Sequence, residues 1–414
     1  MFAKSLVLAL LPLIAVAAPH QRYRAGAARQ ARGEVSCTQP QASNGVNVGK
    51  AIYILTNDAE NAVVAIPIGQ DGMLSKGSVA KTGGAGSIAV DAMGQPAVPD
   101  PLISQSSLTL VGNSIFAVNA GSNSLSMMAI SAEDPTSLSC VGQPVAIPGE
   151  FPNTVAASAK NNLACVGTTG ALAGISCATF SNKGLGEMDG LRAFDIGQTT
   201  PPVGPTNTVS HSFFSADESV LFTTVKGDPA VNNTGFLSVF PVQDAALSKT
   251  DVRSSPEGTA VLFGSALIPN DPSSIFVTDA SFGAAVLTVG SDGRGQVKGS
   301  QAVDGQAATC WVAVSDATKS AFVTDVGVNR VVEMSLDDAS IIKELDLSAN
   351  GDPGLIDLRA AGDFVYALSP GNGTTNAAIT VLDTSGGQGS MKQVQHFDLS
   401  GLAGKNAQGM AVML

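Results

Sequence analysis

The chain has 414 residues, of which 44% are hydrophobic and only 14% are charged, and its formal net charge is −12 at pH 7. Residues 1–32 contain five cations and no acid, so the formal charge changes from −12 to −17 without them. So acidic a chain repels phosphate backbones and anionic lipid surfaces, which argues against a nucleic-acid-binding or membrane-surface protein.

Residues 1–18 have the features of a secretory signal peptide. Lys4 precedes an apolar run from Leu6 to Ala15, and small residues follow the run and offer a cleavage site. The run is too short to anchor a mature protein, and no later stretch reaches about 18 uncharged apolar residues. The sequence therefore predicts a secreted, extracellular protein without a membrane span, either free or associated with the cell wall.

Residues 19–44 are basic, small and aperiodic, which indicates a flexible leader, and the folded domain is expected over 45–414. Secretion also permits N-glycosylation. Two sequons, Asn232-Asn233-Thr234 and Asn372-Gly373-Thr374, make Asn232 and Asn372 the candidate acceptors. The sequence thus predicts a secreted glycoprotein, which we expect to be a monomer.

The chain contains five cysteines, and an oxidising compartment permits disulfides between them. Cys165 and Cys177 flank the stretch VGTTGALAGIS symmetrically, so a hairpin there would place them opposite each other. We therefore predict a disulfide between these two residues. A second possible pair is Cys37 with Cys140, which would leave Cys310 unpaired.

Short β-branched runs alternate with Gly, Asn, Asp, Ser and Pro clusters along the rest of the chain, and no window keeps a helical period. One pattern recurs: a short strand, a polar turn, a strand that ends in Asn or Asp, a second turn and a further strand. In chain order its copies span 50–68, 87–131, 153–180, 210–242, 265–289, 310–336 and 354–383.

The first copy lacks its first strand, and the chain ends in QGMAVML, which resembles that strand. Seven copies at intervals of roughly 44 to 63 residues suit four-stranded blades. The sequence therefore predicts an all-β fold, a seven-bladed β-propeller that is closed by pairing of the N- and C-terminal strands. Such closure removes the free sheet edges that favour aggregation.

In a propeller, the first strand of each blade lines the central channel. Alignment of the copies places the starts of these strands at Ser87, Thr154, His211, Ser265, Trp311 and Gly354, with the seventh near Gln408. The second strands end near Asn57, Asn119, Thr168, Lys226, Asp279, Asp325 and Ser369. We expect both sets of residues to gather around one mouth of the channel.

This polar ring contains a histidine, a lysine, two carboxylates and the only tryptophan, a plausible set for a small-molecule site. Alternative interpretations remain open. His211 could be a structural hydrogen-bonding residue, Trp311 could fill the channel, and Asp279 and Asp325 could cap turns. Arg330 is a further binding candidate, whereas His396 is expected on an outer strand.

The sequence contains no GxSxG, HExxH or phosphate-binding loop. It has only three histidines, one of them in the leader, so a multi-histidine metal site is not expected. We predict no cofactor and no metal, although a calcium ion held by channel carboxylates stays open.

The repeats SADESVLFTTVKGD, SSIFVTDASFG and SAFVTDVGVNRVVEM resemble the lactonase-type seven-bladed propellers. That group includes 6-phosphogluconolactonase-like proteins and fungal carboxymuconate lactonizing enzymes, and the similarity is greatest to secreted fungal members that are 3-carboxymuconate cyclase-like. The resemblance extends over residues 45–414. It implies that His211, in HSFFSADES, is the family's channel histidine and that Asp279 is the acid of the next blade.

The arginine that the family places before that acid's strand is not evident in PEGTAVLFGS, because Arg253 lies out of register. The resemblance therefore implies an extracellular lactonase that acts on a neutral sugar lactone, such as an aldonolactone, in the channel. His211 would be the general base on water, with Asp279 orienting it. The candidate groups for the oxyanion and the substrate are Lys226, Ser87, Thr154, Ser265, Asp325 and Arg330, with Trp311 stacking on the ring.

Two other functions compete with hydrolysis of a lactone. The first is a non-catalytic, adhesin-like propeller that binds an extracellular glycan or protein, since a fold does not fix a function. The second is a carboxymuconate-type cycloisomerase, which secretion and the missing arginine disfavour.

Overall fold

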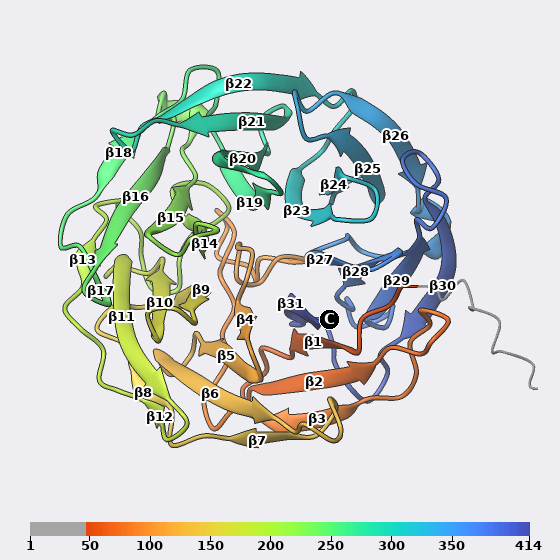
Figure 1. Cartoon of the computed structure of the whole chain (residues 1–414), viewed down its shortest axis with the longest axis horizontal. Helices are drawn as coiled ribbons and strands as arrows, with labels where there is room; N and C mark the ends of the chain where they lie inside the picture. Colours follow the sequence, from red (N-terminus) through yellow and green to blue (C-terminus); the bar gives the residue numbers. More distant parts are fainter. Residues whose placement is uncertain (1–46) are drawn as a thin grey trace, which may run out of the picture. The chain divides into compact units, whose positions relative to one another are not determined.

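The computed structural model describes residues 47–414, and they form seven antiparallel sheets of four or five strands arranged as a β-propeller (Figure 1). In these residues helical structure is limited to two single turns, η1 (Pro229–Val231) and η2 (Ser348–Asn350). The predicted all-β, seven-bladed fold is confirmed. The predicted signal peptide (1–18) and leader (19–44) lie outside the described residues, as do the first two residues of the predicted domain.

The strands follow one another from the channel outward in each blade. Blade 1 contains β1 (Ala51–Leu55), β2 (Ala62–Pro67), β3 (Ser78–Lys81) and β31 (Gln408–Met413). Blade 2 contains β4 (Leu108–Val111), β5 (Ser114–Asn119), β6 (Ser124–Ile130), β7 (Leu138–Cys140) and β8 (Val145–Ala146). Blade 3 contains β9 (Pro152–Ser158), β10 (Leu163–Thr168), β11 (Gly174–Ser181), β12 (Gly184–Leu185) and β13 (Arg192–Ala193).

The second half of the chain repeats this arrangement. Blade 4 contains β14 (Val209–Phe214), β15 (Val220–Val225), β16 (Phe236–Gln243), β17 (Ala246–Leu247) and β18 (Val252–Ser254). Blade 5 contains β19 (Leu262–Ile268), β20 (Asp271–Asp279), β21 (Gly283–Val289) and β22 (Gly295–Ala302). Blade 6 contains β23 (Thr309–Ser315), β24 (Ser320–Asp325), β25 (Arg330–Ser335) and β26 (Ile341–Asp346). Blade 7 contains β27 (Leu358–Ala361), β28 (Phe364–Ser369), β29 (Ala378–Asp383) and β30 (Lys392–Asp398).

Burial explains why some strands are continuous apolar runs and others alternate. The middle strands pack between neighbouring blades on both faces, so every residue of β1 and β24 is buried. The outermost strands β22 and β30 cover the core with one face only, so half-buried and exposed residues alternate along most of their length. Whether a strand is a continuous apolar run or an alternating one thus follows from its position in the blade.

The terminal strands close the ring. The last strand, β31, pairs antiparallel with β1, so that Ile52 lies opposite Val412 and Tyr53 lies opposite Ala411. The predicted pairing of the two ends of the domain is therefore confirmed. Closure satisfies the backbone groups of β1 that would otherwise form a free edge.

The β10–β11 hairpin places Cys165 directly opposite Cys177, and the two residues form a disulfide. The predicted bridge is confirmed. Cys140 is exposed on β7 and Cys310 is buried, and neither has a disulfide partner among residues 47–414. The alternative partner of Cys140, Cys37, lies outside the described residues.

The two candidate glycosylation residues, Asn232 and Asn372, both lie in exposed turns. Glycosylation at these positions stays a prediction. No helix of the described residues is long and apolar enough to cross a membrane.

Two of the predicted strand starts are wrong. Ser87 does not begin the innermost strand of blade 2, because that strand is β4, some twenty residues later. Its carbonyl instead accepts a hydrogen bond from the Asn57 side chain. Gly354 precedes β27 and is not part of it. In both cases an irregular segment stands before the strand and shifts its start.

Candidate active site

The irregular segment before β4 enters the centre of the ring (Figure 1). We call residues 99–107 the channel plug. Its backbone is bonded to three other blades: Gln105 N–H donates to the Ser210 carbonyl, Val155 N–H donates to the Ser106 carbonyl, and the Trp311 indole donates to the Ser104 carbonyl at 3.0 Å. The central channel is thus closed by the protein's own chain.

Side chains also fix the plug. The buried Gln105 amide donates to the Val312 carbonyl at 2.9 Å, and its oxygen accepts the Val312 N–H at 3.2 Å. Gln408 donates to the Ser104 carbonyl at 2.9 Å. Ile103 and Ser106 have φ angles of 50° and 63°, a left-handed conformation that costs a β-branched residue such as Ile about 1 to 3 kcal/mol. These hydrogen bonds hold the segment in this conformation.

Replacement of Gln105 by alanine is expected to lower the free energy of unfolding by about 2 to 4 kcal/mol, because it leaves the buried N–H and C=O groups of Val312 unpaired. Urea denaturation followed by fluorescence of Trp311 measures this change. Gln296→Ala, on the exposed face of β22, is the control and should stay within about 0.5 kcal/mol of the wild type. Equal stabilities of the two variants would show that the plug does not depend on Gln105.

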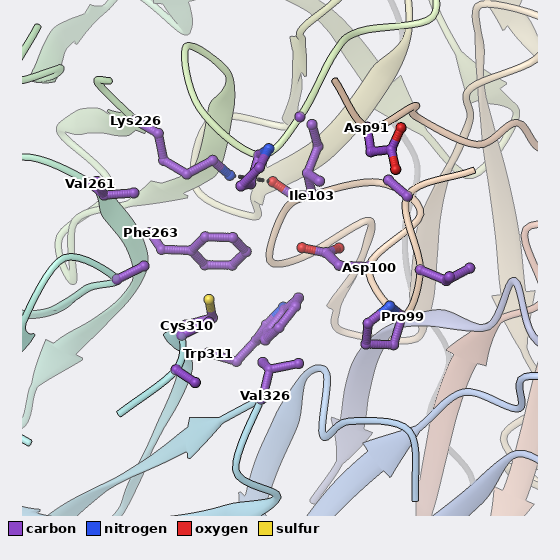
Figure 2. A pocket seen from close by; sticks show the side chains of 18 residues that line it. Asp91, Pro99, Asp100, Ile103, Lys226, Val261, Phe263, Cys310, Trp311 and Val326 are labelled. Atoms are coloured by element: carbon purple, nitrogen blue, oxygen red, sulfur yellow. Dashed lines mark hydrogen bonds between the residues drawn. The ribbon is translucent and has the colours of Figure 1, made fainter. Parts of the chain in front are cut away.

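At one mouth of the channel, between the plug and the inner ends of blades 4 to 6, the surface is hollowed into a pocket of about 340 Å³ (Figure 2). Figure 2 shows Lys226, Phe263, Cys310 and Trp311 on one side of the pocket, and Asp91, Pro99 and Asp100 on the other. The residues of the first group are buried, whereas Val98, Pro205 and Ala307 at the rim are exposed. The pocket thus has a dry floor and an opening to solvent.

Lys226 directly follows β15 and is only 1% exposed. Its Nζ donates to the Ile103 carbonyl at 2.6 Å and lies 4.1 Å from the centre of the Phe263 ring. Burial lowers the pKa of Lys226 to about 8, an effect that the nearby Asp100 carboxylate opposes. Only one of the three ammonium hydrogens has an acceptor among residues 47–414, so the others are available to a ligand.

Asp100 belongs to the plug. Its Oδ1 accepts a hydrogen bond from Gln408 at 2.9 Å. Burial raises the pKa of Asp100 to about 6, and the positive charge of Lys226 limits this rise. A carboxylate and an ammonium group are therefore held in one apolar pocket, each with a pKa displaced toward neutrality, as is typical of acid–base sites.

Trp311 and Cys310, both on β23, form part of the floor. Trp311 is fully buried and contacts Phe263 edge to face, with 4.8 Å between ring centroids. Burial raises the pKa of the Cys310 thiol far above its usual range, so this cysteine stays protonated and is a poor nucleophile.

His211 is the third residue of β14, close to the predicted strand start, but it does not line the pocket. Its Nδ1 accepts the backbone N–H of Ser265 at 3.2 Å, which places the proton of the neutral ring on Nε2. Nε2 lies 2.9 Å from the Ser106 hydroxyl, which also accepts from Arg359. Neither ring nitrogen therefore has a free lone pair with which to take a proton from water. In this geometry His211 cannot act as the predicted general base.

Burial and, to a smaller extent, the positive charge of Arg359 lower the pKa of His211 to about 3. The ring is stacked on Phe213 with 5.0 Å between centroids. His211 therefore has the environment of a neutral structural residue that joins the plug to blades 4 and 5.

The other predicted site residues are engaged in structural contacts away from the pocket. Asp279 does not contact His211; its carboxylate accepts the N–H groups of Ala260, Val261 and Ser281, as a turn cap does. Asp325 forms an ion pair with Arg330 at 2.9 Å. The Thr154 hydroxyl accepts the Ser212 N–H, and the buried Ser265 hydroxyl has no protein partner. Of the predicted set, the pocket brings together Lys226 and Trp311.

Sequence reasoning missed Asp100. The stretch PAVPDPLISQSS (96–107) has no strand period, and its prolines suggested only an insertion within a repeat. The one local signal that this stretch enters the protein is that apolar residues occur in it where a surface loop would be polar. Within residues 47–414, no group of three or more His, Cys, Asp or Glu side chains is placed to hold a metal ion.

Searches with this chain identified no matching family model and no similar curated protein sequence. Several solved structures, however, are similar to this chain in fold. The periplasmic gluconolactonase PpgL of Pseudomonas aeruginosa superposes with a TM-score of 0.64 over 88% of this chain and 99% of that chain, at 14% identity. A Bacteroides fragilis protein that is proposed to be a 6-phosphogluconolactonase gives a TM-score of 0.62 over 91% and 100%, at 10% identity.

A protein of undetermined function from Desulfotomaculum acetoxidans is also similar, with a TM-score of 0.58 over 88% of this chain and 99% of that chain, at 11% identity. At these identities the similarity establishes a common fold. It does not transfer an activity or a set of site residues.

Proposed function

We propose that this protein hydrolyses a neutral lactone in the pocket between the plug and blades 4 to 6, and that it does so outside the cell. The observation that supports this best is that one apolar pocket holds the buried Lys226 and the half-buried Asp100, with the pKa of the acid raised and that of the amine lowered. The gluconolactonase with the same fold and the predicted signal peptide also favour it.

In the proposed reaction, the Asp100 carboxylate removes a proton from a water molecule as the water oxygen bonds to the lactone carbonyl carbon. The Lys226 ammonium group donates a hydrogen bond to the carbonyl oxygen and stabilises the oxyanion that forms. Collapse of this intermediate breaks the bond to the ring oxygen, which takes the proton back from Asp100. The product is a hydroxy acid, which ionises in solution.

This scheme keeps the predicted role of Lys226 and transfers the role of base from His211 to Asp100. It also favours a neutral substrate, because the single cation of the pocket is already close to an anion. A tricarboxylate substrate of a cycloisomerase would bring three negative charges near Asp100.

A specific observation also supports the alternative of binding without turnover. The plug closes the channel with many hydrogen bonds, which is the behaviour of a rigid binding platform. Under this alternative, the protein binds an extracellular glycan or protein and does not open a lactone.

The test is the opening of δ-valerolactone by the purified full chain, followed by proton release and compared with the spontaneous rate. We expect acceleration by the wild type and its loss in Asp100→Asn, which keeps the size of the side chain and an oxygen for Gln408. If neither δ-valerolactone nor any other neutral lactone is opened faster than in buffer, the proposed activity is wrong.

The pH dependence of kcat/KM is expected to be bell-shaped with a maximum near neutrality. Asp100 must be ionised to act as a base, so the rate falls as the pH decreases through about 6. Lys226 must be protonated to bind the oxyanion, so the rate falls as the pH increases through about 8. The two values belong to the interacting pair. Initial rates between pH 4.5 and pH 9, corrected for spontaneous hydrolysis, measure the profile, and a flat profile would contradict the assignment.

A further inference from the structure

We propose that the lactone bears an apolar substituent and that polyhydroxylated sugar lactones are poor substrates. This inference rests on the proposed lactone hydrolysis, and it reverses the substrate that the sequence favoured. The inference follows from the pocket lining, which has many apolar side chains and few polar ones.

The polar groups of the pocket are very few. Among the 18 described residues that line it, only Asp91, Asp100, Lys226, Cys310 and Trp311 have side chains with a polar or ionisable atom, and the Trp311 indole already donates to the Ser104 carbonyl. Asp91 is engaged in its own turn, because its Oδ1 accepts the N–H groups of Met93 and Gln95, both at 2.8 Å. The lining includes no Ser, Thr, Asn or Gln. Asp100 and Lys226 are thus the groups left for a ligand.

A sugar lactone needs many more partners than this pocket has. Each of its hydroxyls both donates and accepts hydrogen bonds in water, and a hydroxyl buried without a partner weakens binding by roughly 10-fold or more. The carbonyl and the attacking water would already use Lys226 and Asp100. Several sugar hydroxyls would then lie against apolar side chains.

The apolar walls suit an alkyl or aryl group instead. Ala97, Val98 and Pro99 form the wall on the plug side, and Ala308 and Val326 form the wall on blade 6. Figure 2 shows Val326 beyond the Trp311 ring as seen from Lys226. A lactone whose carbonyl contacts Lys226 would therefore direct a substituent toward Val326. The pocket volume of about 340 Å³ is small for a ligand site, so the substituent must be short.

The experiment compares kcat/KM for δ-valerolactone, δ-heptalactone, δ-decalactone and glucono-δ-lactone. Burial of each added methylene should raise kcat/KM by about fourfold until the pocket is filled. Glucono-δ-lactone should be opened no faster than in buffer. In Val326→Thr, which keeps the shape but replaces a methyl group with a hydroxyl, the ratio of kcat/KM for δ-decalactone to that for δ-valerolactone should fall several-fold. The control is Val394→Thr on the outer strand β30, where the ratio should not change.

The outcomes separate this inference from the proposed function. Faster opening of glucono-δ-lactone than of the alkyl lactones would overturn the inference and leave lactone hydrolysis standing. If none of the four is opened, the proposed function fails, and calorimetric titration with δ-lactams then tests the pocket alone. Tighter binding of an alkyl-substituted lactam than of the unsubstituted one would support the apolar site, and equal or undetectable binding of both would overturn it.

Discussion

Replacement of Lys226 by methionine is expected to reduce kcat/KM for lactone hydrolysis by about 100- to 1,000-fold, the usual effect of removing one oxyanion donor. Methionine has nearly the length of lysine and no charge, so the floor of the pocket stays filled, and Asp100, which loses its opposite charge, takes up a proton more readily. Stability should change little, because loss of the hydrogen bond to the Ile103 carbonyl is offset by removal of a buried ammonium group. Steady-state kinetics at pH 7 with an alkyl δ-lactone measure the effect.

A matched control for this variant is Lys343→Met. Lys343 lies on β26 and also donates to backbone carbonyls, those of Gly389 and Met391, but it is remote from the pocket. We expect this variant to keep the wild-type kcat/KM. A second diagnostic is the pH profile of the residual activity: Asp100→Asn should lack the acidic limb, whereas Lys226→Met should lack the alkaline limb. Full activity in Lys226→Met would exclude the pocket as the site of hydrolysis.

The sequence predicted the architecture because the information for it is local and repeated. Strands that are buried on both faces must be apolar runs, and the turns between them need Gly, Asn or Asp, so each blade leaves the same signature. The partial first copy and the spare strand at Gln408–Met413 then indicated closure. The Cys165–Cys177 bridge could be predicted for the same reason, since both residues belong to one hairpin.

The sequence indicated the residues of the proposed site only where they depend on the repeat. Lys226 and Trp311 occupy defined positions in their blades, and the alignment placed both near the channel mouth. Asp100 lies on the plug, whose conformation depends on hydrogen bonds to distant residues such as Val312, Trp311 and Gln408. No local pattern encodes contacts of this kind. The prediction for His211 failed similarly, because its protonation state is determined by Ser265 and Ser106 from other blades.

His211→Gln is expected to make the protein more resistant to acid without loss of lactone hydrolysis. In the unfolded chain His211 takes up a proton as the pH falls below about 6.5, whereas in the folded protein its pKa is about 3. Stability is therefore fully present above pH 6.5 and is lost by about 1.4 kcal/mol per pH unit on acidification toward pH 3. Between pH 6.5 and pH 5 the contribution of this residue amounts to about 2 kcal/mol.

The measurement is the free energy of unfolding in urea at pH 7, 6, 5 and 4 for both proteins. Asp100 acts in the opposite direction, because its pKa is raised by folding and its protonation near pH 6 stabilises the folded state. That contribution is common to the wild type and the variant, so it cancels in their difference. The slope of the difference therefore reports His211 alone. Equal slopes would mean that His211 titrates normally in the folded protein, and a histidine that gains and loses its proton near neutrality would again be a candidate for the general base.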